Sequence, residues 1–294
     1  MERYGAASYV NTIDMLRKEK PHYIVKDKFL NIELIEVPVS DIKIHYKPEE
    51  RAQEIYQNPQ DKLEELAREF ISILKDSGIP LQYIGITGSL LLKIHNITIS
   101  DIDVLVYSRK YSTQALDVIE EEFNKRTIDI PRQFLEEWVK EIVRTYPCLD
   151  YNIAARIIMR RKHRVVYRNR VFSINFVRVE EEVKEKYGDY IYRSVRPVRV
   201  KARVVDSSES IFLPGVYYVE DVKPIDDLCI PKITQVVTFE GLYSGIAKEG
   251  EEVVVYGMLE EVVSVHTGET YYRIVIGSAS LKSMDYILPL NIID

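Results

Sequence analysis

The stretch Gly85-Ile86-Thr87-Gly88-Ser89, followed by Ser100-Asp101-Ile102-Asp103-Val104-Leu105-Val106-Tyr107, decides the fold of this chain. It predicts a strand that ends in Gly-Ser, a short helix, and a second strand that opens with two carboxylates. Because side chains alternate along a strand, Asp101 and Asp103 are expected on the same face. Neighbouring carboxylates repel each other and favour a bound cation. In a chain with few histidines and cysteines, a hard ion such as Mg²⁺ or Mn²⁺ fits best.

The turn at Gly88 and Ser89 predicts a phosphate site. At the mouth of a helix it offers backbone N–H groups and a hydroxyl, which suit an anion. A phosphate cradle beside two metal-binding carboxylates is the equipment for handling a nucleoside triphosphate. Taken singly, such turns and acid pairs are common as helix caps and solvated strand faces. Their order and spacing, on a strand this hydrophobic, favour the functional interpretation.

The run GITGSLLLKIHN, residues 85–96, with SDIDVLVY, residues 100–107, resembles the nucleotidyltransferase superfamily typified by DNA polymerase beta. It is also similar to a set of predicted archaeal nucleotidyltransferases. The resemblance is clearest over residues 81–107 and extends more weakly to about residue 190. It implies transfer of a nucleotidyl group from an NTP to an acceptor hydroxyl. By the same resemblance, Gly88 and Ser89 bind phosphates, and Asp101 and Asp103 are catalytic and hold Mg²⁺ or Mn²⁺.

The superfamily usually carries a third carboxylate on a later strand, here residues 171–177, where Asn175 stands in its place. An amide oxygen can ligate a cation and contact a nucleotide, but it is no general base. Glu180, just past that strand, is the candidate third catalytic carboxylate, and Asp150 is a weaker one. Two alternatives therefore stay open. One is a non-catalytic nucleotide- or RNA-binding protein of the same fold, and the other is an antitoxin-like partner protein.

Charge is distributed unevenly along the chain. The net charge is −6, yet residues 151–205 carry +10 and residues 206–294 carry −10. The basic block, Arg156–Arg170, clusters arginines with Tyr167 among them and Tyr151 nearby, which suits a phosphate-rich partner such as RNA. Arg160 and Arg164 are assigned to nucleotide binding on this ground. The alternative is a solvated face that pairs with the acidic C-terminal part, which itself suggests a packing surface or a protein-docking module.

The chain predicts an α+β protein in three parts. Residues 1–48 form an α+β lead-in expected to pack on the catalytic domain. Residues 49–190 form the nucleotidyltransferase domain, a mixed sheet with flanking helices. Residues 191–294 contain about five short strands and predict a small OB-like barrel. Within the middle part, Asn58 with Pro59 is expected to start one helix and Ser112 to cap another, while His95 is expected to be a polar surface residue.

Several classes of protein are excluded by composition. The cysteines, Cys148 and Cys229, are too few for a disulfide scaffold or a Cys-rich zinc site. No run approaches the roughly eighteen apolar residues of a membrane span, and the N-terminus shows no signal-peptide pattern. These observations predict a cytoplasmic protein without membrane contact. The many Ile, Val, Tyr, Glu, Lys and Arg residues are typical of a thermophile.

Overall fold

The computed structural model describes residues 6–226 and 229–293. Its helices are α1 Ala6–Glu19, α2 Pro48–Gln57, α3 Lys62–Asp76, α4 Gly88–Leu91, α5 Arg109–Asn124, α6 Arg132–Thr145, α7 Tyr151–Arg161 and α8 Leu290–Ile293. Its strands are β1 Ile24–Lys26, β2 Glu33–Ile35, β3 Ile84–Thr87, β4 Ile102–Tyr107, β5 Arg164–Tyr167, β6 Arg170–Val177, β7 Tyr190–Asp206, β8 Gly215–Pro224, β9 Ile233–Thr238, β10 Glu252–Ser264, β11 Thr270–Ile276 and β12 Tyr286–Pro289. The protein is therefore mixed α+β, as expected.

The first large sheet is mixed and has the strand order β3-β4-β6-β5. Strand β4 runs antiparallel to β3 and parallel to β6, and β5 and β6 form the expected hairpin. Alternate residues along the strands, such as Ile86, Val104 and Ile174, are fully buried. They pack against apolar residues of α2, α3 and α5 in one core. Because this face is filled by helices, the opposite face of the sheet carries the polar residues of the strands.

The second large sheet closes into a five-stranded barrel. Its order is β11-β9-β8-β7-β10, and β10 also pairs with β11, which completes the ring. Strand β12 pairs with Val253–Tyr256 of β10, on the same edge that β11 uses further along the strand. A small C-terminal barrel of about five strands was expected, and the barrel has five. Strand β12 and helix α8, which follow the barrel strands, were not anticipated.

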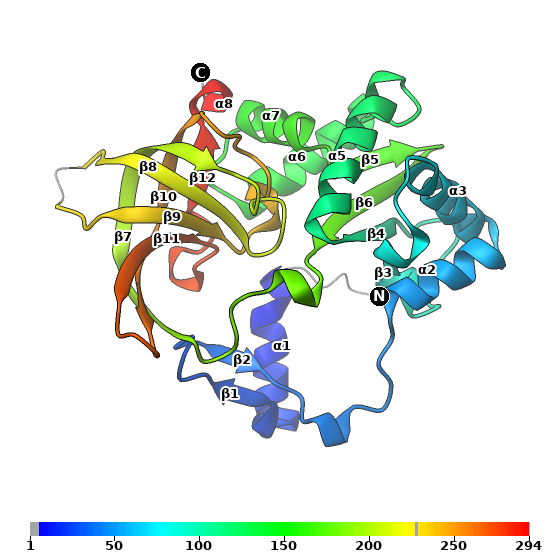
Figure 1. Cartoon of the computed structure of the whole chain (residues 1–294). Helices are drawn as coiled ribbons and strands as arrows, with labels where there is room; N and C mark the ends of the chain where they lie inside the picture. The colour runs from blue at the N-terminus through cyan, green and yellow to red at the C-terminus, as the bar shows by residue number, and fades with distance from the viewer. Residues whose placement is uncertain (1–5, 227–228, 294) are drawn as a thin grey trace.

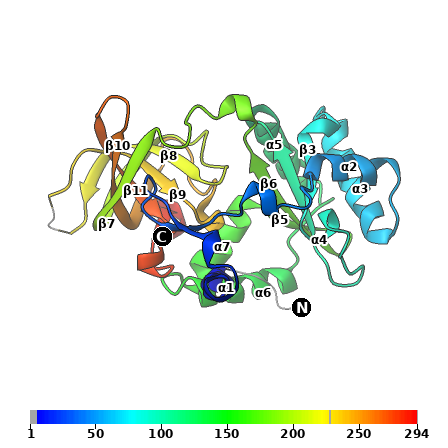
Figure 2. The ribbon, with the colours of Figure 1, turned by 90° about the horizontal axis from the view of Figure 1, so that it is seen from below.

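Helices α6 and α7 lie between the mixed sheet and the barrel (Figures 1 and 2). Ile157 of α7 and Leu149, just before it, belong to the apolar core of the barrel. Ile142 and Tyr146 pack against the same core. These helices were assigned by sequence to the nucleotidyltransferase part, yet they bury their apolar faces on the barrel.

The N-terminal lead-in contacts the segment that enters the barrel. The backbone N–H of Tyr192 donates to the carbonyl of Phe29 (2.9 Å), and the Tyr187 hydroxyl donates to Asp27 (2.5 Å). Figure 1 shows α1 with the β1–β2 hairpin below the barrel. The lead-in therefore contacts the end of the 49–190 part, at Tyr187, as well as the start of β7. Among the described residues, no helix has the length and apolar character that crossing a membrane requires.

Two helix starts differ from the sequence prediction. Asn58 ends α2 as its C-cap, and α3 begins after Asp61, whose side chain accepts hydrogen bonds from the N–H groups of Leu63 and Glu64. A carboxylate that satisfies two free N–H groups outcompetes the Asn-Pro signal. Helix α5 begins after Ser108, and the buried Ser112 hydroxyl instead donates to the carbonyl of Val106.

Candidate functional site

A row of polar residues crosses the mixed sheet on the face opposite its helices, here called the outer face. Thr87 pairs with Asp103, Asp103 with Ser173, and Ser173 with Arg164, one residue from each strand. Paired residues on neighbouring strands share a face and lie about 5 Å apart. The row therefore brings the Gly-Ser turn, the acidic pair and one basic residue to the same edge of the sheet.

Gly88 packs directly against the carboxylate of Asp103. Its φ of +65° lies in the left-handed region, where glycine carries no Cβ penalty. A Cβ built at this position would collide with an Asp103 carboxylate oxygen. The glycine is therefore required twice, by the turn and by the closeness of the acid. The predicted neighbourhood of Gly88, Ser89 and Asp103 is present.

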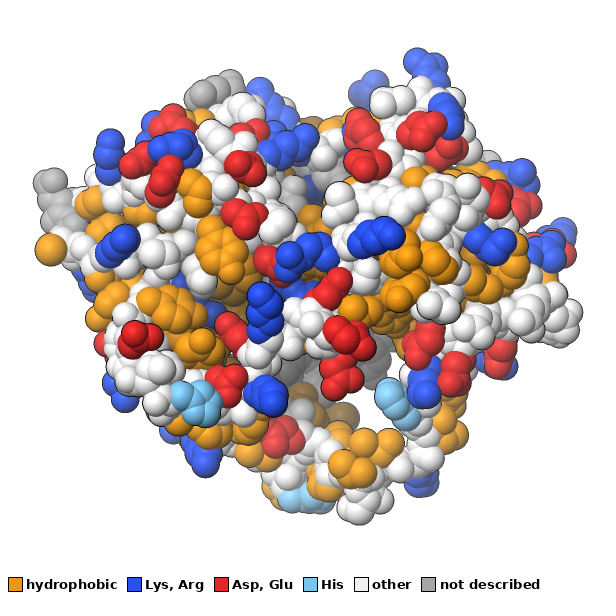
Figure 3. Space-filling view, in the orientation of Figure 1, with side chains coloured by type: hydrophobic (Ala, Val, Ile, Leu, Met, Phe, Trp, Pro, Cys, Tyr) orange, Lys and Arg blue, Asp and Glu red, His pale blue; other side chains and the backbone are white. Residues whose placement is uncertain are grey.

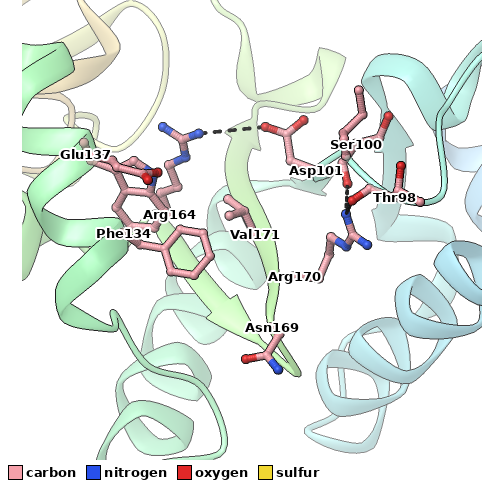
Figure 4. A pocket seen from close by; sticks show the side chains of 11 residues that line it. Thr98, Ser100, Asp101, Phe134, Glu137, Arg164, Asn169, Arg170 and Val171 are labelled. Atoms are coloured by element: carbon pink, nitrogen blue, oxygen red, sulfur yellow. Dashed lines mark hydrogen bonds and ion pairs between the residues drawn. The ribbon is translucent and has the colours of Figure 1, made fainter.

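Asp101 lies at the opening of β4, beside a pocket of about 280 Å³. Figure 4 shows Asp101 pointing toward Arg164 across this pocket. The loop before Asp101 is fixed by Arg170, whose Nη1 donates to the carbonyls of Thr98 (3.1 Å) and Ser100 (3.0 Å). Arg170 Nη2 donates to the carbonyl of Ile97 (2.8 Å). One guanidinium thus holds the carbonyls of residues 97, 98 and 100 and sets the position of Asp101.

Arg164 is the cation of this pocket. Its Nη2 lies 3.9 Å from Asp101 Oδ2 and its Nη1 lies 3.5 Å from Glu141 Oε2. The guanidinium carbon lies 4.6 Å from the ring centre of Trp138. Arg164 Nε is buried and has no hydrogen-bond partner. Both ion pairs are long, so this side chain is positioned by stacking and keeps donor capacity toward the pocket.

The acidic pair fits a hard divalent ion. Asp101 and Asp103 are two residues apart on the outer face, so their carboxylates project to the same side. Carboxylate oxygens are the ligands that Mg²⁺ and Mn²⁺ prefer. The two carboxylates could therefore supply oxygen ligands to such an ion.

Helix α2 supports the Gly-Ser turn from below. Arg51 is only 6% exposed, and its Nε donates to the carbonyl of Leu90 in α4 (2.9 Å). Its other nitrogens pair with Glu54 and with the buried Glu64.

On the outer face, burial and the nearby Glu49 carboxylate raise the pKa of Tyr107 to about 12. The Tyr107 phenol therefore stays protonated at neutral pH.

A second group of potential metal ligands consists of Asp61, Glu64 and His95. Most of their oxygens and nitrogens are already engaged, although the buried His95 Nδ1 has no hydrogen-bond partner. His95 Nε2 lies 2.7 Å from Asp61 Oδ2, and Asp61 Oδ1 accepts from two backbone N–H groups of α3. Glu64 pairs with Arg51 and accepts from the N–H of Gln60. The group therefore connects the start of α3 to the loop after α4. His95 was expected at the surface, but its side chain is mostly buried.

The structure does not bring the proposed third carboxylate to the acidic pair. Asn175 is exposed and pairs with Leu105, two residues further along the sheet than Ser173. Glu180 follows β6 beyond Val177, which pairs with Tyr107. Tyr107 lies four residues, or about 13 Å, along β4 from Asp103, so Glu180 is at the far end of the strand from the acidic pair. Asp150 caps α7 by accepting from the N–H of Ile153 (2.8 Å). The β6 residue beside Asp103 is Ser173.

Most of the basic block makes contacts within the protein. Arg160 pairs with Glu251 at the barrel (2.5 Å) and Arg156 donates to the carbonyl of Ile292 (2.9 Å). Similar intramolecular partners hold Arg161, Lys162 and Arg168. Figure 3 shows acidic and basic side chains interspersed on the barrel rather than separated. Of the two arginines assigned to nucleotide binding, Arg164 lies at the row of polar residues, whereas Arg160 is engaged with the barrel.

Sequence reasoning missed several residues that shape the site. Arg51, Phe134, Trp138 and Ser173 were not assigned any role, and Arg170 was counted only as part of the basic block. Contacts between distant segments define these roles, so no local pattern announces them. The sequence offers one usable signal, because Trp138 is the only tryptophan of the chain.

A protein of Methanocaldococcus jannaschii named "Uncharacterized protein MJ1086" is 31% identical to this chain over 275 residues. The match covers 92% of this chain and 78% of that protein. The chain belongs to the family of this archaeal protein. No family model matches the sequence, and no solved structure matches it.

Proposed function

We propose that this protein is a metal-dependent nucleotidyltransferase, which transfers a nucleotidyl group from an NTP to an acceptor hydroxyl. The observation that carries the proposal is the packing of Gly88 against Asp103 at the sheet edge that also presents Asp101. A phosphate-binding turn and a metal-binding acid pair are useful together only for a ligand that contains both a phosphate and a cation.

The arrangement of strands supports a nucleotidyltransferase-like fold for the middle part of the chain. The Gly-Ser turn ends β3, the acidic pair opens its antiparallel neighbour β4, and the parallel strand β6 follows after three helices. This is the order of motifs on which the resemblance to the superfamily rests. For the closed five-stranded barrel, we propose an OB-like relationship on strand number and size.

In the proposed reaction, the acceptor oxygen attacks the α-phosphorus and the bond to the β-phosphate breaks. Pyrophosphate leaves, and the hydroxyl proton passes to solvent or to a base. Gly88 and Ser89 orient the β- and γ-phosphates, and Asp101 and Asp103 hold Mg²⁺ or Mn²⁺ on the triphosphate. The bound ion supplies charge stabilisation to the attacking and leaving oxygens. Positioning and electrostatics thus carry most of the rate acceleration.

A second candidate is a non-catalytic nucleotide-binding protein of the same fold. The observation that favours it is Ser173, which stands beside Asp103 where a carboxylate would complete the site. A serine hydroxyl is no base at neutral pH. General-base assistance is typically worth about 10²–10⁴-fold in rate, so a protein without it binds the nucleotide and turns over slowly or not at all.

Label transfer separates the two candidates. The protein is incubated with each α-labelled NTP, with Mg²⁺ or Mn²⁺, and with nucleotides or bulk RNA as acceptors. The transferase proposal predicts metal-dependent labelling of an acceptor that Asp103→Asn abolishes and that Asp117→Asn, on an exposed position of α5, leaves intact. Saturable NTP binding without transfer supports the binder instead. In that case Ser173→Asp is expected to restore transfer, since it places a carboxylate beside Asp103.

A further inference from the structure

We propose that the pocket between α6 and the β5–β6 hairpin binds the acceptor, and that this acceptor is a nucleoside monophosphate unit. The inference rests on the proposed function, because it assigns the second substrate of the same site. The pocket is lined by residues from the loop before β4, from α6 and from the hairpin (Figure 4). Free nucleotides and the terminal nucleotide of an RNA share this chemistry.

The position of the pocket assigns it to the acceptor. Along the polar row, Gly88 lies at the β3 end and Arg164 at the β5 end, with Asp101 and Asp103 between them. In-line displacement places the leaving group and the attacking oxygen on opposite sides of the phosphorus. If the triphosphate occupies the Gly-Ser end, the attacking hydroxyl arrives from the side of the pocket.

The wall of the pocket suits a planar ring. Phe134 and Trp138 of α6 line it, with ring centres 5.9 Å apart. Because Trp138 is 5% exposed and Arg164 covers its ring, Phe134 offers the accessible ring. Phe134 is partly exposed, and Val171 and Ile99 add apolar surface. Nucleobases stack on aromatic side chains with about 1–3 kcal/mol per base, largely independent of the base. An aromatic wall beside a nucleotidyl-transfer site is thus a place for a base.

A charged group accompanies the ring. Both Nη groups of Arg170 donate hydrogen bonds to the carbonyls of residues 97, 98 and 100. Arg164 also lines the pocket, and its two ion pairs, with Asp101 and Glu141, are long. A metal ion on Asp101 would replace Arg164 as the partner of that carboxylate. Arg164 is then available to a phosphate, which its planar fork binds well.

The pocket is small, and three arginines of the basic block do not line it. Its volume of about 280 Å³ lies just below the usual range for drug-sized ligands, so it admits one ring with its attached group. Arg156, Arg160 and Arg161 donate to the barrel or to the C-terminal segment instead of lining a groove. The acceptor is therefore recognised as a single nucleotide unit.

Fluorescence of Trp138, the only tryptophan, reports on this pocket directly. The full chain with Mg²⁺ and without NTP is titrated with adenosine monophosphate, adenosine, inorganic phosphate and a short oligoadenylate. We expect a saturable change with adenosine monophosphate and at least about tenfold weaker binding of adenosine, since a charged hydrogen bond is lost. Arg164→Gln is expected to remove this preference. The matched control is Arg168→Gln, on the same hairpin but paired with Glu69 outside the pocket.

Each result decides the proposal. Equal affinity for adenosine and its monophosphate, or an unchanged preference in Arg164→Gln, overturns it, as does a tryptophan signal that none of the probes alters. Tighter binding of the oligonucleotide assigns the unit to an RNA end, and weaker or equal binding assigns it to a free nucleotide. The titration needs no turnover, so it can fail while the transferase proposal stands, and it can succeed in a protein that transfers nothing.

Discussion

At the scale of residues, the candidate site depends on Gly88, because glycine has no Cβ. The turn requires a left-handed backbone, and the Asp103 carboxylate occupies the space that a Cβ would fill. Many turn glycines meet only the first requirement. Gly268, at φ +71°, has open space around it. The two positions therefore separate the conformational cost of a substitution from its effect on the acid.

Gly88→Ala is expected to abolish metal-dependent NTP binding. The new methyl group displaces the Asp103 carboxylate, and the left-handed backbone costs about 1 kcal/mol of stability in addition. Gly268→Ala carries the same backbone cost without the collision. Denaturant unfolding should show a loss for both variants, and calorimetry should show lost nucleotide binding for Gly88→Ala alone. Nucleotide binding that survives in Gly88→Ala would argue against a role for this turn.

His163 gives the protein a pH dependence. Burial and the adjacent Arg161 guanidinium hold the pKa of His163 well below its usual 6.5. Arg161 Nη2 lies 2.7 Å from His163 Nδ1 and donates a hydrogen bond to it. Below pH 6.5 the unfolded chain therefore binds a proton that the folded protein refuses, so stability falls as the pH is lowered.

The slope is at most about 1.4 kcal/mol per pH unit for one proton. His163→Gln keeps a hydrogen-bond acceptor for Arg161 but does not titrate. Its unfolding free energy should thus depend less on pH than that of the wild type between about pH 7 and pH 5. Urea unfolding across this range measures both curves. Parallel curves would mean that His163 titrates normally in the folded protein.

The sequence predicts the site well where the pattern is local. Alternation along one strand is enough to place Asp101 and Asp103 on one face, and Gly88 follows directly in the turn. The residue beside Asp103 on β6 depends on the register between two strands separated by three helices. Register is set by packing across the sheet, and it places Ser173 there, two residues before Asn175.

Competition between helix-start signals decides the structure at the scale of elements. Asn58-Pro59 has the form of a helix start, but Asp61 accepts two backbone N–H groups and also meets His95. Propensity alone does not choose between two adjacent caps, because the choice also depends on the contact between Asp61 and His95, which is distant in the sequence. The strands of the barrel, by contrast, are marked by Val- and Tyr-rich runs between turns, and these were predicted.

Asp61 is expected to act as a cap and not as a metal ligand. Asp61→Asn keeps an oxygen for the α3 N–H groups and should cost little, whereas Asp61→Ala should cost about 1 kcal/mol. Chelation of divalent ions should leave the melting temperature of the wild type unchanged. The control is Asp150→Ala, which removes the cap of α7 at a similar cost. Destabilisation by a chelator that Asp61→Asn eliminates would instead identify a structural metal.

Opposite charges join the two large parts at the scale of the whole molecule. The basic segment and the acidic C-terminal part were predicted either to bind separate partners or to pair with each other. Arg160 and Glu251, each about one-fifth exposed, form such a pair. Opposite signs in the sequence made this outcome visible as an alternative, but only the packing of α7 on the barrel decides it.

A double-mutant cycle tests the Arg160–Glu251 pair. Arg160→Gln and Glu251→Gln should couple by about 1–3 kcal/mol in unfolding experiments, since the pair is mostly shielded from solvent. The exposed pair Arg132–Glu136 serves as the control and should couple by less than about 1 kcal/mol. If both cycles give equal coupling energies and Arg160→Gln retains RNA more weakly, Arg160 would instead be a nucleic-acid contact.

The central claim is that the Gly-Ser turn and the acidic pair bind one metal–nucleotide complex. Titration calorimetry with ATP, in Mg²⁺ and in a chelator, tests it directly on the wild type, on Asp101→Asn with Asp103→Asn, and on Asp117→Asn. The account predicts Mg²⁺-dependent binding that the double variant loses and that Asp117→Asn retains. The double variant should remain folded, since neither side chain belongs to the apolar core. Unchanged Mg²⁺-dependent binding in the double variant would contradict the account.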